Sequence, residues 1–217
     1  FHEIAFAIPL IALALISYLE GEFHKSLIFT ILLTLIKEDL GITFGVLFGI
    51  LVLLKGNKIY GFLITSTSLL MSFLAMFVVI PHFNPNHAYP YFAIAQRGSG
   101  NENQSLISII FHQQIWLLDP YKQKTIFLLL LISLGIAFLS PIAYLVLPTL
   151  VFRMLSMQIT YWSWTYHYDA VLMPIIFIAL IDALCKLKIQ KSFILDKIVR
   201  IVPFVSVILA VGIFLVL

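Results

Sequence analysis

About eight apolar segments make up most of the chain, and polar stretches separate them, all short except one at residues 81–124. A helix needs roughly 20 apolar residues to cross a bilayer, so several segments are short for an ideal lipid-facing span. Short spans indicate helix ends that lie below the lipid headgroups, around a cavity. The pattern predicts an all-α, polytopic transmembrane helix bundle with one long polar loop. The segments cover residues 4–19, 23–36, 40–54, 62–80, 125–139, 142–152, 170–185 and 201–217.

Composition supports an integral membrane protein. The chain is 62% hydrophobic and 11% charged, with a mean hydropathy of +1.08, whereas soluble domains carry about 25% charged residues. The net charge of +3 fits basic cytoplasmic loops better than nucleic-acid binding. A single cysteine, Cys185, excludes an internal disulfide. Because the chain starts without Met and ends inside an apolar segment, we interpret residues 1–217 as one transmembrane domain that is a fragment of a longer protein.

Basic residues predict which side of the membrane each loop faces. The stretches 55–61 and 186–200 are rich in Lys, as cytoplasmic loops are. Counting spans from these two loops makes residues 81–124 one long extracytoplasmic loop. The same count puts three polar clusters outside, at residues 1–3, 37–39 and 166–169. We therefore predict a multi-pass protein of the cell membrane whose polar site faces the extracytoplasmic side.

The cluster Lys37-Glu38-Asp39 lies between two apolar segments. Ionisable groups below the headgroups are costly, so at least one of the three is expected to face a polar cavity. In the functional interpretation, Lys37 binds a phosphate and Glu38 or Asp39 holds a partner or a substrate hydroxyl. The alternative is an ordinary interfacial turn with a helix cap, and the residues alone leave both open.

The other two polar clusters are equally ambiguous. His2 and Glu3 suit a general acid/base pair or metal ligands, but also a solvated helix start where the dipole favours Glu. Aromatic residues between Arg153 and Asp169 form either an interfacial aromatic belt or the lining of a sugar site that includes His167. The remaining histidines lack the spacing of metal ligands. The sequence therefore indicates no metal or other cofactor, although a divalent ion stays compatible with it.

The order of short motifs along the chain resembles a known family. The motifs are Phe1-His2-Glu3, Lys37-Glu38-Asp39, Ile80-Pro81-His82-Phe83-Asn84-Pro85, Tyr89-Pro90-Tyr91, a Gly-Ser-Gly turn, and His167-Tyr168 before Met173-Pro174. This order is similar to that of an uncharacterised family of prokaryotic, including bacterial, membrane proteins known as domain of unknown function 2079. The resemblance covers essentially the whole chain.

The resemblance implies a function, because that family looks like the GT-C class of membrane glycosyltransferases. Such enzymes transfer a sugar from a polyprenyl-phosphate donor on the extracytoplasmic side, so the implied partners are that lipid and membrane lipids, with no nucleic acid. The implied catalytic residues, which position the acceptor or the catalytic acid, are His2, Glu3, Glu38 and Asp39, and the implied substrate- and phosphate-binding residues are Lys37, Arg97, Arg153, His167 and Tyr168.

The chain departs in two ways from the pattern of these enzymes and of the family. GT-C enzymes carry an acidic catalytic motif in their first outer loop, which is expected upstream of Phe1. The family commonly has a second His after His167-Tyr168, where this chain has Asp169, so a role resting on that His is in doubt.

Two other function classes stay open on the sequence. A transporter is expected to place polar residues near the bilayer midplane on broken helices, often in inverted repeats. A non-catalytic scaffold or assembly protein is expected to point its outer charges to solvent and to have no groove into the bilayer.

Overall fold

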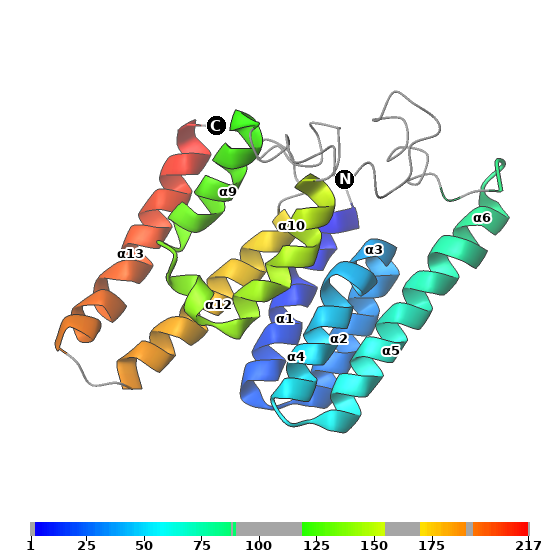
Figure 1. The fold of residues 1–217 in the computed structure, drawn as a ribbon, viewed down its shortest axis with the longest axis horizontal. Helices are drawn as coiled ribbons and strands as arrows, with labels where there is room; N and C mark the ends of the chain where they lie inside the picture. Colours follow the sequence, from blue (N-terminus) through cyan, green and yellow to red (C-terminus); the bar gives the residue numbers. More distant parts are fainter. Residues whose placement is uncertain (1–2, 88, 90–118, 155–169, 190–192, 217) are drawn as a thin grey trace.

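The computed structural model describes residues 3–87, 89, 119–154, 170–189 and 193–216. Every regular element in these residues is helical, which confirms the predicted all-α class (Figure 1). The first half contains η1 (Glu3–Phe6), α1 (Ala7–Glu20), α2 (Phe23–Ile36), α3 (Glu38–Leu40), η2 (Gly41–Gly45), α4 (Val46–Leu54), α5 (Lys58–Leu74), η3 (Ala75–Val79) and α6 (Ile80–Phe83). The second half contains α9 (Pro120–Ile132), η5 (Ile136–Leu139), η6 (Pro141–Leu145), α10 (Val146–Met154), α12 (Leu172–Ile189) and α13 (Phe193–Val216).

Two helices in the described residues are long and apolar enough to cross a membrane. They run over Glu3–Glu20 and Lys58–Phe83, and the second includes α5, the π-helix η3 and α6. Phe23–Ile36 and Pro141–Met154 are shorter apolar helices. Length and composition therefore support membrane insertion for part of the chain, and the shorter helices need neighbours to cover their polar ends.

One predicted span is wrong in its extent. The apolar segment 125–139 is not one helix, because α9 ends at Ile132 and the chain turns at Leu134 and Gly135. Both turn residues have positive φ, 50° and 72°, and the glycine adopts this conformation without strain. The 13 residues of α9 extend only about 20 Å at 1.5 Å per residue. The helix is thus shorter than the roughly 30 Å hydrocarbon core.

The connections between helices are also shorter than predicted. The sequence predicts a loop over residues 55–61, but α5 begins at Lys58, where the Asn57 side chain caps the helix by accepting from the Tyr60 backbone N–H. In the stretch 186–200, α12 continues to Ile189 and α13 begins at Phe193. The first and last residues of the predicted long loop 81–124 belong to α6 and α9, respectively. Helical structure therefore extends into polar sequence wherever a cap or a favourable dipole supports it.

The helices of the bundle run between two ends. Figure 1 places α3, the end of α6, the start of α9 and the end of α10 along its upper edge. We call this the Lys37 end, after the residue between α2 and α3. The α1–α2 turn, the α4–α5 turn, the end of α12 and the start of α13 lie at the lower edge, which we call the Lys55 end. The helices alternate in direction between these ends.

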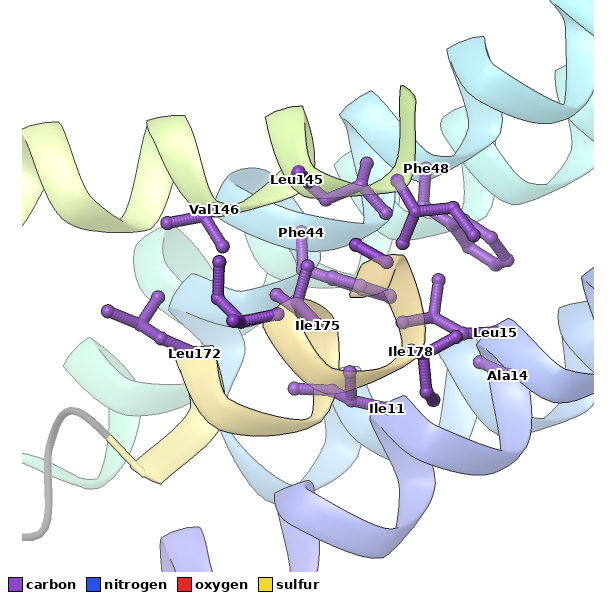
Figure 2. Close-up of a cluster of buried hydrophobic side chains, with 14 of the residues drawn as sticks. Ile11, Ala14, Leu15, Phe44, Phe48, Leu145, Val146, Leu172, Ile175 and Ile178 are labelled. Carbon is purple, nitrogen blue, oxygen red and sulfur yellow. The ribbon is translucent and has the colours of Figure 1, made fainter. Parts of the chain in front are cut away.

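The core lies where α12 meets α1, η2, α4 and η6. Figure 2 shows Ile11 of α1, Phe44 of η2, Phe48 of α4 and Ile175 of α12 converging on one apolar cluster. Large side chains also cover the outside, such as Phe204 of α13, which is 73% exposed. An apolar interior together with an apolar exterior is the distribution expected of a bundle surrounded by lipid.

The π-helix η2 and α4 approach α5 through small residues. Glycines at positions 41, 45 and 49 face Ser72, Ser68 and Thr65, respectively. A Cβ added to Gly49 would lie 2.7 Å from the Thr65 backbone nitrogen and 2.9 Å from the Gly61 carbonyl oxygen. Only glycine permits this backbone contact, as in other closely packed membrane helices. The contact holds η2 and α4 against α5. Residues 37–39, which directly precede η2, are held there with them.

Candidate functional site

The helical path breaks at Lys37, between α2 and α3. Lys37 is extended, with φ −146° and ψ 114°, and its neighbours on both sides are helical. Its N–H donates to the Leu33 carbonyl (3.1 Å), and its own carbonyl accepts from Leu40 N–H (3.1 Å). The break therefore leaves these backbone groups bonded while it places three ionisable residues at the end of the bundle. A π-helix, η2, follows directly, and π-helical turns are frequent at functional sites.

Glu38 is fixed from two other parts of the chain. The Tyr89 hydroxyl donates to Glu38 Oε1 (2.6 Å), and Ser72 Oγ of α5 donates to the Glu38 carbonyl oxygen (2.6 Å). Gly41 makes the second bond possible, because a Cβ there would lie 2.1 Å from Ser72 Oγ. A hydrogen bond to an ionised carboxylate is short and strong, so Glu38 is positioned before any ligand binds.

Asp39 has an unused acceptor. Its Oδ1 is buried, and no group in the part of the chain that the structure describes donates a hydrogen bond to it. Its backbone carbonyl accepts from Thr43 Oγ1 (2.9 Å). Lys37, Glu38 and Arg153 all lie within electrostatic range of the carboxylate, and two of these three neighbours are cations. Leaving a buried acceptor unsatisfied costs about 1–3 kcal/mol, so this oxygen is suited to a hydroxyl or a cation from outside the chain.

Two buried cations lie at the same end of the bundle. Arg153, in the last turn of α10, is 6% exposed, and Lys122, in the first turns of α9, is 4% exposed. Lys122 Nζ donates to the carbonyl oxygen of Met154 (2.8 Å), the residue after Arg153. Lys and Arg are rarely this buried unless they are paired. The end of α10 therefore brings positive charge to the Asp39 carboxylate, and the Lys122–Met154 contact holds the start of α9 against the end of α10.

The structure brings together some of the predicted site residues. Residues 37–39 and Arg153 share one cluster. Glu3 is exposed in η1 at the same end of the bundle (Figure 1). The predicted residues that lie outside the described part of the chain are His2, Arg97, His167 and Tyr168.

Sequence reasoning missed two residues of the cluster, Tyr89 and Lys122. Tyr89 stood in a family motif without a role, and its partner Glu38 is 51 residues away. Lys122 stood in a polar stretch that was expected to be loop. The only signal for it was the Asp119-Pro120 pair before an apolar run, which marks a helix start.

The Lys55 end holds a second set of polar contacts with a different character. Lys55 Nζ donates to the Tyr18 carbonyl at the end of α1 (2.6 Å) and lies 4.3 Å from the centre of the Tyr18 ring. Asp182 accepts from Ser140 Oγ (2.5 Å) and pairs with Lys186 (2.5 Å). Burial lowers the pKa of Lys55, an effect that Asp182 opposes and Lys186 reinforces. These groups satisfy one another and cap helix ends, so they serve structure.

The cluster at the Lys37 end has no built metal site in the described residues. No three His, Cys, Asp or Glu side chains there gather so that they could hold a metal ion. The chemistry available from the described side chains is anion binding by Lys37, Lys122 and Arg153, and hydrogen-bond acceptance by Glu38 and Asp39.

Replacing Tyr89 by phenylalanine should lower the unfolding midpoint of the full-length protein in detergent. The variant removes one hydrogen bond to a charged group, worth about 1.5–3 kcal/mol, at the 2.6 Å contact with Glu38. Tyr144→Phe is the matched control, since Tyr144 is half-exposed on η6. Equal midpoints for the two variants would show that the Tyr89 hydroxyl does not hold Glu38.

The chain matches a family model from end to end, over residues 1–217, and the family is described as a predicted membrane protein. Neither the curated proteins nor the solved structures gave a match.

Proposed function

Since the chain belongs to DUF2079, a family of predicted membrane proteins, we propose that it is a multi-pass enzyme of the GT-C glycosyltransferase type. In this proposal it takes a sugar from a polyprenyl-phosphate donor and transfers it to an acceptor hydroxyl. The single observation that carries the proposal is the buried Arg153 beside Asp39, a carboxylate with an unused acceptor oxygen.

The cations suit a lipid-linked phosphate. Arg presents a planar fork of donors that matches phosphate oxygens, and charge-assisted bonds of this kind are roughly twice as strong as neutral ones. Arg153 and Lys37 lie at helix ends, where the phosphate of a membrane-embedded lipid would meet the protein. Burial of Arg153 reduces the screening of its charge by water. In our proposal these two cations bind the donor phosphate.

The carboxylates suit the acceptor. In the proposed reaction, the acceptor oxygen attacks the anomeric carbon, the bond from that carbon to the phosphate oxygen breaks, and the acceptor proton passes to a carboxylate. No group in the described residues donates to Asp39 Oδ1, so this oxygen is suited to accept that hydrogen bond from the acceptor. The leaving phosphate gains negative charge, which Lys37 and Arg153 would stabilise. Catalysis then rests on positioning and on preorganised charge.

The distribution of charge favours an extracytoplasmic site. Lys55, Lys58, Lys186 and Lys188 all lie at the Lys55 end, opposite the cluster (Figure 1). Because Lys and Arg concentrate on the cytoplasmic side of membrane proteins, we assign the Lys37 end to the outside of the cell membrane.

Two observations weigh against the other function classes. A transporter needs polar groups free for substrate near the midplane, but Thr30, Thr34 and Thr65 donate to backbone carbonyls of their own helices. Ser68 Oγ has no partner among the described residues, but it packs directly against Gly45 and leaves no room for a substrate. A scaffold would point its charges to solvent, but Arg153 is buried. Both observations support a ligand site at one end of the bundle.

The proposal is tested by Lys37→Ala and Glu38→Ala in the full-length protein. Each should lower sugar transfer from a polyprenyl-phosphate donor by about 100-fold, the effect of removing one well-placed electrostatic group. Lys37→Ala should also weaken donor binding. Lys58→Ala, at the other end of the bundle, is the control and should keep full activity. If transfer and donor binding survive both substitutions, the proposed function is wrong.

A further inference from the structure

An apolar groove lies beside the charged cluster, between η2 and α10. It has a volume of about 500 Å³ and is lined by Ile42, Thr43, Leu147, Pro148, Val151 and Phe152. Five of these six side chains are apolar. Ile42, Leu147, Val151 and Phe152 are about half-exposed, so the groove is open along its outer side. We call it the η2–α10 groove.

One end of the η2–α10 groove meets the charged cluster. Phe152 directly precedes Arg153, and Thr43 lies one turn after Asp39, to whose carbonyl its hydroxyl donates (2.9 Å). From there the groove follows α10 back to Leu147, toward the Lys55 end. A molecule in it would have its apolar part among hydrocarbon side chains and its head at the buried Arg153.

We propose that the η2–α10 groove seats the hydrocarbon chain of a polyprenyl phosphate, in the part of the chain nearest the phosphate. This inference rests on the proposed function and adds to it the path by which the lipid reaches the site. The head of the ligand is anionic, because the cations Arg153, Lys37 and Lys122 lie at that end. The tail is hydrocarbon, because apolar side chains of η2 and α10 line the groove.

Ile42, Val151 and Phe152 give this groove an irregular, branched and aromatic wall. Such a wall complements the methyl branches of an isoprenoid better than it complements a straight acyl chain, since packing depends on matched shapes. The burial of Arg153 and Lys122 requires the phosphate to enter between helices. An ordinary bilayer phospholipid keeps its phosphate in the headgroup layer. It would therefore not place its phosphate at the buried cations and its tail in the groove at the same time.

The test uses a photoreactive polyprenyl phosphate and the full-length protein in nanodiscs, with adducts located by mass spectrometry. Adducts are expected at residues 42–43 and 147–152. Val151→Trp fills the groove and should reduce them at least tenfold. Val211→Trp, on an equally exposed position of α13, should leave them unchanged. Leu147→Trp provides a second groove-filling variant, and size-exclusion profiles verify that every variant is folded.

Three results would overturn the inference. They are adducts spread evenly over lipid-facing helices such as α13, adducts unaffected by both groove-filling variants, and equal labelling by a photoreactive phosphatidylglycerol, which would mark an ordinary surrounding lipid. Failure of the groove is distinguishable from failure of the proposed function. If saturable binding persists and Lys37→Ala weakens it while the adducts lie elsewhere, only the groove is wrong. If binding is not saturable, the proposed function fails as well.

Discussion

Arg153→Ala is expected to weaken polyprenyl-phosphate binding by about 30-fold or more. Removing one partner of a buried charge pair costs about 2–5 kcal/mol, and each 1.4 kcal/mol is tenfold in affinity. Arg153 is 6% exposed, so water cannot replace it at the phosphate. Arg153→Lys should recover only part of the affinity, because an ammonium group lacks the planar fork of a guanidinium. Native mass spectrometry of the full-length protein measures the bound lipid.

The same residue should be coupled to Asp39 in the free protein. A double-mutant cycle of Arg153→Ala and Asp39→Asn should give a coupling energy above about 1 kcal/mol, since the carboxylate and the cation interact at a buried site. The matched control is the exposed ion pair between Arg200 and Asp196 of α13 (3.7 Å), where the coupling should stay below about 0.5 kcal/mol. Strict additivity at Arg153 and Asp39 would show that the two do not form one site.

Gly49→Ala should destabilise the contact between α4 and α5. The new Cβ would meet backbone atoms of Thr65 and Gly61 at 2.7 and 2.9 Å, and backbone cannot rotate away as a side chain can. Overpacking of this kind costs about 1–3 kcal/mol. Gly212→Ala on α13 is the control, because nothing lies within 4 Å of its Cβ position. Unfolding in a mixed-micelle denaturant series measures both variants.

The two variants are expected to change stability in opposite directions, or the control not at all. Alanine is favoured over glycine inside a helix by up to about 1 kcal/mol, so Gly212→Ala should leave stability unchanged or raise it. If Gly49→Ala behaves like Gly212→Ala, α4 and α5 do not make the close contact that holds residues 37–39 in place.

The helical class was predictable from the sequence because long apolar runs report directly on helices. The break at Lys37 was also readable, since three ionisable residues interrupt such a run. The end of α9 at Ile132 was not, because apolar residues continue on both sides of the turn at Leu134 and Gly135. Glycines at positions 41, 45 and 49 have the four-residue spacing of a packing face, but nothing in the spacing identifies α5 as the partner helix.

The candidate site was predictable only where its residues are neighbours in sequence. Residues 37–39 are adjacent, whereas the proximity of Arg153 to Asp39 depends on how α10 packs against η2. Lys122 binds a backbone carbonyl 32 residues away, and a carbonyl carries no sequence signature. Tertiary contacts of this kind explain why Lys122 and Tyr89 were recognised as part of the candidate site only from the structure. The assignments of His2, Arg97, His167 and Tyr168 stay predictions.

The most direct test of the central idea, that the Lys37 end of the bundle binds a lipid-linked phosphate, is a titration of the purified full-length protein in nanodiscs with polyprenyl monophosphate. Saturable binding of polyprenyl monophosphate is expected, and neutral polyprenol should bind at least tenfold more weakly. Lys37→Ala should reduce this difference in affinity between the two lipids. Equal affinity for polyprenol and polyprenyl monophosphate, or binding that never saturates, would contradict it.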